Sequence, residues 1–119
     1  GFFSAVCARQ GDGSSGKPVD PSKVMVRARR QQHLAELLER FGQLFTDTPA
    51  IHETASSDYR YRIFVPKPEW SEVVKALVTE MDYDNFKDAA HAQLDGTPEG
   101  REYTHALSDV WQVMADLQD

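Results

Sequence analysis

Apolar and polar residues alternate with a period of two along residues 23–30 and 58–65, and this pattern predicts two strands. The run at residues 2–8 is apolar and rich in aromatic and β-branched side chains, so it predicts a third, mostly buried strand. Residues 50–55 are a weaker strand candidate. A Ser-Ser-Asp turn separates them from 58–65, and the two segments are expected to form a hairpin.

Apolar residues three and four positions apart predict amphipathic helices at residues 31–45, 69–81 and 99–118. Asp84 is a candidate N-cap for one further short helix between the last two. Residues 10–22 contain three glycines and two prolines. They are therefore expected to form a mobile loop, because neither a helix nor an interior strand tolerates this composition.

The predicted order is β-β-α-β-β-α followed by two further helices, which indicates one α+β domain over residues 1–119. A loop joins the first two strands, and this argues against an all-parallel α/β fold. Moving the last strand of a βαββαβ order to the N-terminus reproduces the pattern, so we expect a permuted ferredoxin-like, four-stranded antiparallel sheet. Strands 23–30 and 58–65 would be its central neighbours, two helices would cover one face, and residues 84–119 would form a C-terminal helical extension.

The same alternation assigns four arginines to the sheet face that the helices leave open. The helix-facing side is expected to hold Val24, Val26, Ala28, Tyr59, Tyr61, Ile63 and Val65. The open side is expected to hold Met25, Arg27, Arg29, Arg60, Arg62 and Phe64. Four like charges in close proximity repel one another unless something compensates them.

Two interpretations of these arginines follow. They could pair with carboxylates of a second subunit in a homodimer, of another protein partner, or of the C-terminal helices, such as Glu99, Glu102, Asp109 and Asp116. Alternatively, the open face could bind a small anion, a nucleotide or single-stranded nucleic acid, because guanidinium groups fork onto phosphates and stack on bases. The first interpretation predicts a non-enzymatic interaction module that self-associates through an edge strand or through the open sheet face. The second predicts an anion- or nucleotide-binding protein.

The composition narrows these alternatives. The 119 residues include 13 Lys and Arg against 19 Asp and Glu, a formal charge of −6, which disfavours general nucleic-acid binding. Hydrophobic residues make up 40% of the chain, enough for one core, and no apolar run approaches the roughly 20 residues that span a bilayer. The single cysteine, Cys7, cannot form an internal disulfide, so a cytoplasmic location without a membrane partner is expected.

A second candidate site is a polar segment in the C-terminal third of the chain. Three carboxylates lie close together in the sequence: Asp82, Asp84 and Asp88. We expect Tyr103 and His105 to complete a polar site with them. A small enzyme that uses these residues is a third hypothesis. The segment lacks the glycine and the terminal glutamate of a calcium loop, and the four histidines lack metal-ligand spacing. No metal and no cofactor are therefore predicted.

Two further motifs have structural explanations. Residues 11–18 approach the phosphate-loop pattern, but Pro18 replaces the hydroxyl that would hold magnesium, and the segment leads into a strand instead of a helix. Cys7 lies in a predicted strand, where a cysteine is expected to behave as a small buried hydrophobe. Trp70 and Trp111 have the helical spacing that is typical of core residues.

Four segments together resemble a family of short bacterial proteins of uncharacterised function. They are Gly-Phe-Phe-Ser at 1–4, Asp-Tyr-Arg-Tyr-Arg at 58–62, Asp-Tyr-Asp-Asn-Phe-Lys-Asp at 82–88 and Val-Trp-Gln-Val-Met at 110–114. The resemblance implies a small cytoplasmic bacterial protein. It implies no activity and gives no residue a role.

Overall fold

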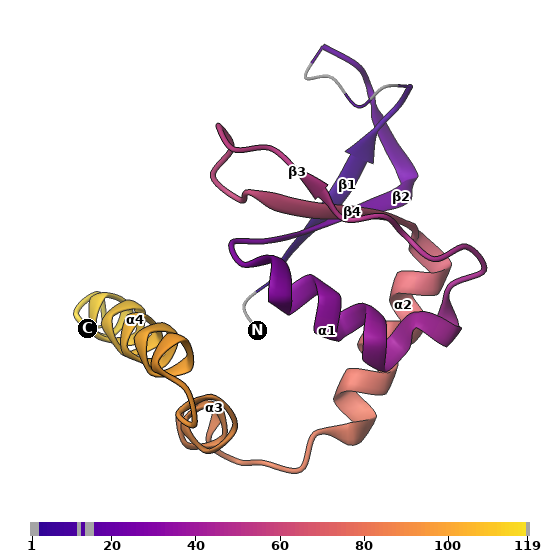
Figure 1. The fold of residues 1–119 in the computed structure, drawn as a ribbon. Coiled ribbons are helices and arrows are strands. Elements are labelled where there is room, and N and C mark those ends of the chain that lie inside the picture. The colour runs from indigo at the N-terminus through magenta and orange to yellow at the C-terminus, as the bar shows by residue number, and fades with distance from the viewer. Residues whose placement is uncertain (1–2, 12, 14–15, 119) are drawn as a thin grey trace. The chain divides into compact units, whose positions relative to one another are not determined.

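The computed structural model describes residues 3–11, 13 and 16–118, and the chain divides into two compact units, Gly1–Glu80 and Met81–Asp119 (Figure 1). The first unit contains a four-stranded antiparallel sheet with helices, and the second contains two helices. The α+β class is thereby confirmed, whereas the single domain expected from the sequence stays a prediction.

The sheet has the strand order β1-β2-β4-β3. Its strands are β1 (Ser4–Arg9), β2 (Val19–Ala28), β3 (His52–Glu53) and β4 (Tyr61–Pro66). β2 and β4 are the central neighbours, as predicted, and they pair antiparallel with Val26 opposite Ile63. β1 pairs with β2 at one edge, and the two-residue β3 pairs with β4 at the other.

The helices follow the predicted spacing with small shifts at their ends. They are α1 (Gln31–Phe41), which continues into the 3-10 turn η1 (Gly42–Leu44), α2 (Lys67–Glu80), α3 (Phe86–Leu94) and α4 (Pro98–Ala115). α2 begins directly after β4, because Pro68 suits the first turn of a helix, where its missing N–H removes no hydrogen bond.

The core lies between one face of the sheet and the helices α1 and α2 (Figure 1). Val26, Ala28 and Ile63 of the central strands are fully buried, together with Leu34 of α1 and Val73 of α2. Burying one such side chain contributes about 1.5–3 kcal/mol for residues of valine size or larger. The alternation of β2 and β4 therefore identified the helix-facing side correctly along both strands.

β2 begins four residues earlier than the alternation predicts. Residues 19–22 belong to the strand, so the expectation that all of residues 10–22 form a loop is wrong for this part. The pairing register shifts between Cys7 and Ala8, and Pro21 lies in the stretch of β2 opposite this shift, where the irregular ladder needs no backbone donor. Three residues of the expected loop lie outside the described residues: Asp12, Ser14 and Ser15.

β1 is an edge strand, and most of its side chains are exposed, including that of Cys7. The apolar run had predicted a mostly buried strand with a buried cysteine, and both expectations are wrong. The physical reason is position, because α1 and α2 pack on β2 and β4 and leave much of the edge strand uncovered. Ala8 is the buried residue of this strand, and Phe2 lies outside the described residues.

In the second unit, α3 and α4 pack against each other as a helical hairpin. The side chain of Asn85, not that of Asp84, caps α3, and it accepts a hydrogen bond from the backbone N–H of Asp88 at 3.1 Å. The amphipathic pattern of the last helix is only partly used for burial. Leu107 is half-buried, whereas the side chain of Trp111 is 52% exposed, so its expected place in the core is wrong.

The turn between α3 and α4 is closed by local contacts. Thr97 caps α4 by accepting a hydrogen bond from the N–H of Gly100 at 3.0 Å, and Pro98 occupies the first helical position. A Cβ atom on Gly100 would lie 1.7 Å from the carbonyl oxygen of Leu94, so the close approach of the two helices requires glycine. No helix in the described part of the chain is long and apolar enough to cross a membrane.

Candidate functional site

The sheet face opposite α1 and α2 carries the arginines that the alternation assigned to it. Met25 and Arg27 of β2 and Arg62 and Phe64 of β4 lie on this side, and Arg29 follows just beyond the end of β2. We call these five residues the arginine face. Arg27 and Arg62 are direct register partners on the two central strands, so the pairing of the sheet itself brings two positive charges together.

Tyr59 holds two of these arginines through its ring. It lies in the bend that precedes β4, and the guanidinium carbons of Arg27 and Arg29 lie 4.7 and 4.1 Å from the ring centroid. At these distances the electrons of an aromatic ring attract a guanidinium group. The ring therefore draws two like charges towards the same place without neutralising either of them.

The sequence pattern had assigned Tyr59 to the helix-facing side together with Tyr61. This assignment is wrong because β4 begins only at Tyr61, and the residues before it follow a turn. The N–H of Thr54 donates to the carbonyl oxygen of Arg60 at 2.7 Å and closes that turn. Period-two alternation has no meaning outside the strand, so the ring of Tyr59 is free to turn to the arginine face.

The remaining contacts of the arginine face are hydrogen bonds to neutral acceptors. Arg62 donates from Nη2 to the carbonyl oxygen of Tyr59 at 3.0 Å and to the hydroxyl of Ser57. Arg27 donates from Nη2 to the hydroxyl of Ser4 at 2.7 Å. The Nε atoms of both arginines are buried without a hydrogen-bond partner within the described part of the chain. These contacts fix the side chains in place, and none of them brings a negative charge to either arginine.

Arg60, the fourth predicted arginine, has a carboxylate partner. Its Nε lies 2.6 Å from Oε1 of Glu53 on β3, and this hydrogen bond and the charge of Glu53 raise the pKa of Arg60. By contrast, no carboxylate among the described residues of 3–80 forms an ion pair with Arg27, Arg29 or Arg62. The acids named as their partners, Glu99, Glu102, Asp109 and Asp116, belong to the second unit, and that pairing stays a prediction.

Exposed apolar side chains flank the uncompensated arginines. Phe64 is 39% exposed, and Val6 of β1, the register partner of Met25, is 42% exposed. The ring of His52 on β3 lies 5.5 Å from that of Phe64, centroid to centroid, in an edge-to-face arrangement. The surface therefore combines positive charge with apolar area, which suits a partner that carries carboxylates beside apolar side chains.

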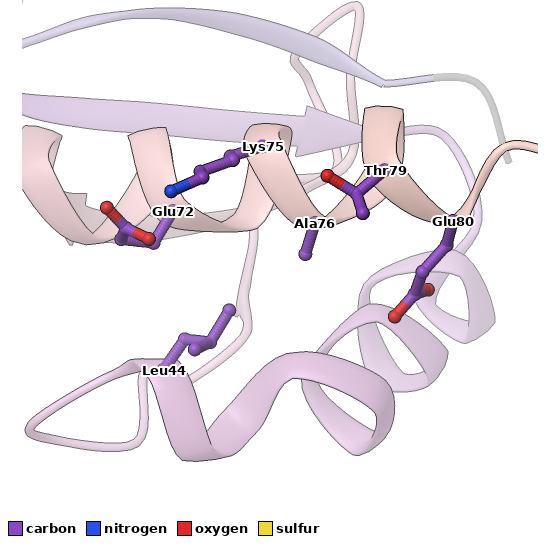
Figure 2. A pocket seen from close by; sticks show the side chains of 6 residues that line it. All are labelled: Leu44, Glu72, Lys75, Ala76, Thr79 and Glu80. Carbon is purple, nitrogen blue, oxygen red and sulfur yellow. The ribbon is translucent and has the colours of Figure 1, made fainter.

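A separate groove of about 250 Å³ lies in the first unit between η1 and α2 (Figure 2). It is lined by Leu44, Glu72, Lys75, Ala76, Thr79 and Glu80. Glu80 forms an ion pair with Arg40 of α1, so this carboxylate is already engaged in joining the two helices. No residue that the sequence nominated for a site lines this groove.

The structure places the second predicted site along the helical hairpin. Asp82 and Asp84 are exposed in the segment before α3, and Asp88 is exposed in the first turn of α3. Nε2 of His105 lies 3.9 Å from Oδ2 of Asp109 on the same helix, and Tyr103 is half-buried on α4. No group of three or more His, Cys, Asp or Glu suited to a metal ion occurs among the described residues. A catalytic role of this segment stays a prediction.

Asp95, which the sequence did not single out, is the polar centre of the hairpin. Its Oδ1 accepts a hydrogen bond from the hydroxyl of buried Thr104 at 2.7 Å, and its Oδ2 lies 2.7 Å from Nδ1 of His91. Arg101 donates to its carbonyl oxygen at 2.9 Å. The hydrogen bonds from Thr104 and His91 lower the pKa of Asp95. A carboxylate just before a Gly-Thr-Pro turn was the available signal, and these contacts give it a structural role.

Comparison of the chain with protein families, with curated proteins and with solved structures gives no significant match. The resemblance to a family of short bacterial proteins therefore stays a prediction.

Proposed function

We propose that this protein is a non-enzymatic interaction module that self-associates and uses the arginine face as its binding surface. One observation carries the proposal: Arg27, Arg29 and Arg62 are held around Tyr59 by neutral groups, with no carboxylate partner among the described residues of 3–80. A partner that supplies carboxylates removes the repulsion between these charges and forms charge-assisted hydrogen bonds, which are the stronger kind. The exposed apolar residues beside them, Phe64 and Val6, would be buried in the same contact.

The strand order supports a further proposal about the fold. We infer that the sheet is a permuted ferredoxin-like sheet, because moving its first strand to the C-terminus would give the βαββαβ order. In such an arrangement one face is covered by the two helices and the other is available for binding. A cytoplasmic, bacterial origin remains a proposal that rests on the single cysteine and on the resemblance.

The proposed self-association can be tested by sedimentation velocity of the full chain at protein concentrations that span about a hundredfold range. We expect the wild type to shift from monomer to dimer, and we expect the variant Arg27→Gln/Arg62→Gln to dimerise more weakly. Because charge attraction is screened by salt, the dimer should also weaken as NaCl is raised. A wild type that stays monomeric over the whole range would contradict the proposal.

A second candidate function has its own supporting observation. The guanidinium groups of Arg27 and Arg29 lie at the ring of Tyr59, and such a surface could hold a phosphate group with a base stacked nearby. A thermal-shift screen with phosphate, sulfate, nucleotides and short single-stranded RNA tests this small-anion or nucleotide hypothesis. A ligand of the face should raise the melting temperature of the wild type and not that of Arg27→Gln/Arg62→Gln. An equal shift in both proteins would place the ligand elsewhere.

A further inference from the structure

The two compact units carry opposite formal charges. Residues 1–80 contain 11 Lys and Arg against 10 Asp and Glu, a charge of +1, whereas residues 81–119 contain 2 against 9, a charge of −7. The acidic excess of the whole chain therefore comes from the segment that contains the helical hairpin. The uncompensated arginines belong to the other unit.

α4 presents an acidic row beside an apolar row. Its acidic row is Asp109 on the helix and Asp116 at its C-cap, both exposed and seven residues apart, which is close to two helical turns. Its apolar row is Ala106, Val110 and Val113, and Leu117 continues it just beyond the end of the helix with the alternating four- and three-residue spacing of a coiled-coil seam. Val113 and Leu117 are 63% and 72% exposed, so this seam is formed and left unburied by the hairpin itself.

The arginine face has the complementary composition, with three positive charges beside exposed Phe64 and Val6. We infer that the arginine face binds the acidic and apolar rows of α4 from a second copy of this chain. The inference rests on the proposed self-association and names the two surfaces that form it. Because every chain carries one surface of each kind, two copies form two reciprocal contacts in a closed dimer.

Charge favours this arrangement over a contact between two copies of α4. Pairing the seams of two α4 helices would bring Asp109 and Asp116 of each copy towards a second acidic row, and like charges across an interface are costly. Docking α4 on the arginine face replaces that repulsion by attraction to Arg27, Arg29 and Arg62. The apolar row is buried in either case, so the charges decide between the two.

Charge reversal of each surface, alone and in mixture, tests the inference on the full chain. The first variant is Arg27→Glu/Arg29→Glu, and the second is Asp109→Arg/Asp116→Arg. In a dimer of either variant alone, like charges face each other at both reciprocal contacts. We therefore expect its dimerisation to be at least about 100-fold weaker than that of the wild type. In an equimolar mixture both contacts regain opposite charges, and we expect a mixed dimer within about tenfold of the wild-type affinity.

Matched controls keep the result interpretable. Glu36→Arg/Glu39→Arg makes the same charge change as the second variant on exposed positions of α1. Its mixed dimer with the first variant keeps only one contact between opposite charges, so it should be much weaker than that of the two charge-reversed variants. Circular dichroism verifies that each variant is folded, and Arg29→Glu alone, at an exposed position, replaces the first variant if Arg27→Glu unfolds the sheet. A wild-type dimer whose charge-reversed variants do not recombine overturns this inference and leaves self-association standing. A wild type that is monomeric throughout overturns both.

Discussion

Replacing Tyr59 by leucine should expose the repulsion that its ring now offsets. The ring lies 4.7 Å from the guanidinium carbon of Arg27 and 4.1 Å from that of Arg29. A cation–π contact at an exposed site contributes about 0.5–1 kcal/mol, so the two contacts together contribute about 1–2 kcal/mol. Leucine keeps a shorter apolar side chain without an aromatic ring and removes both contacts.

The opposing repulsion follows from the same two distances. The guanidinium carbons of Arg27 and Arg29 lie at most about 8.8 Å apart, the sum of their distances to the ring centroid. At that separation two unit charges repel by about 0.5 kcal/mol with the dielectric constant of water, and by about 2 kcal/mol with the value of 20 that suits a protein surface. Attraction to the ring and repulsion between the charges are therefore of similar size in the wild type.

This balance predicts that Tyr59 and Arg29 are energetically coupled in a double-mutant cycle. Arg29→Gln in the wild type removes one attraction and one repulsion, so the free energy of unfolding should change little. In the Tyr59→Leu background the same substitution removes repulsion alone and should raise the free energy of unfolding by about 0.5–2 kcal/mol. Tyr59→Leu by itself should lower it by about 1–2 kcal/mol.

Urea unfolding followed by the fluorescence of Trp70 measures these differences, since this tryptophan packs against the core of the first unit. The measurements use a Trp111→Phe background to remove the second tryptophan. Tyr59→Phe is the matched control, because it keeps the ring and should be nearly neutral. If Arg29→Gln has the same effect with and without the ring, the two groups are not coupled, and the ring does not offset the repulsion between Arg27 and Arg29.

Three further predictions concern positions outside the arginine face. Gly100→Ala should destabilise the hairpin by about 1–3 kcal/mol, because its Cβ would lie 1.7 Å from the carbonyl oxygen of Leu94. Loss of the helical circular dichroism signal measures this effect. Gly96→Ala is the control and should have no effect, because open space surrounds its Cβ. Burial lowers the pKa of His33, so the folded state favours its neutral form. The free energy of unfolding should therefore fall as the pH drops below about 6.5. Urea titrations at a series of pH values should show a weaker pH dependence for His33→Gln. The lowered pKa of Asp95 stabilises the fold above its ordinary pKa and is lost as acid protonates it, so Asp95→Asn should reduce thermal stability at neutral pH and cost little near pH 2.

The part of the fold that the sequence predicts well is the part where local pattern and burial agree. Along β2 and β4, alternate residues such as Val26 and Ile63 enter the core, so the period-two pattern identifies both the strands and their buried side. The same reasoning placed Arg27 and Arg62 on the opposite face. These assignments depend only on the two faces of a strand, which the sequence encodes directly.

Features that depend on tertiary position were not predictable in this way. Cys7 lies in a strand as expected, but its exposure depends on which strands the helices cover, and no local pattern records that. Tyr59 looked like one more alternating residue, but β4 begins only two residues later, so the alternation does not determine the side of its ring. The contact between Asp95 and Thr104 joins residues nine positions apart through a turn whose geometry only the folded hairpin defines.

The last helix shows that an amphipathic pattern does not by itself establish burial within the same unit. An apolar stripe at helical spacing predicts that those side chains pack against another surface. It does not say whether that surface belongs to the same chain or to a partner molecule. The hairpin half-buries Leu107 and leaves Val113 and Leu117 among the most exposed large apolar residues of the described chain. Arg27, Arg29 and Arg62 form no ion pair with the described residues of 3–80, so their like charges repel one another. A contact between the two surfaces would resolve both, because it buries the stripe and supplies acids to the arginines in one interface.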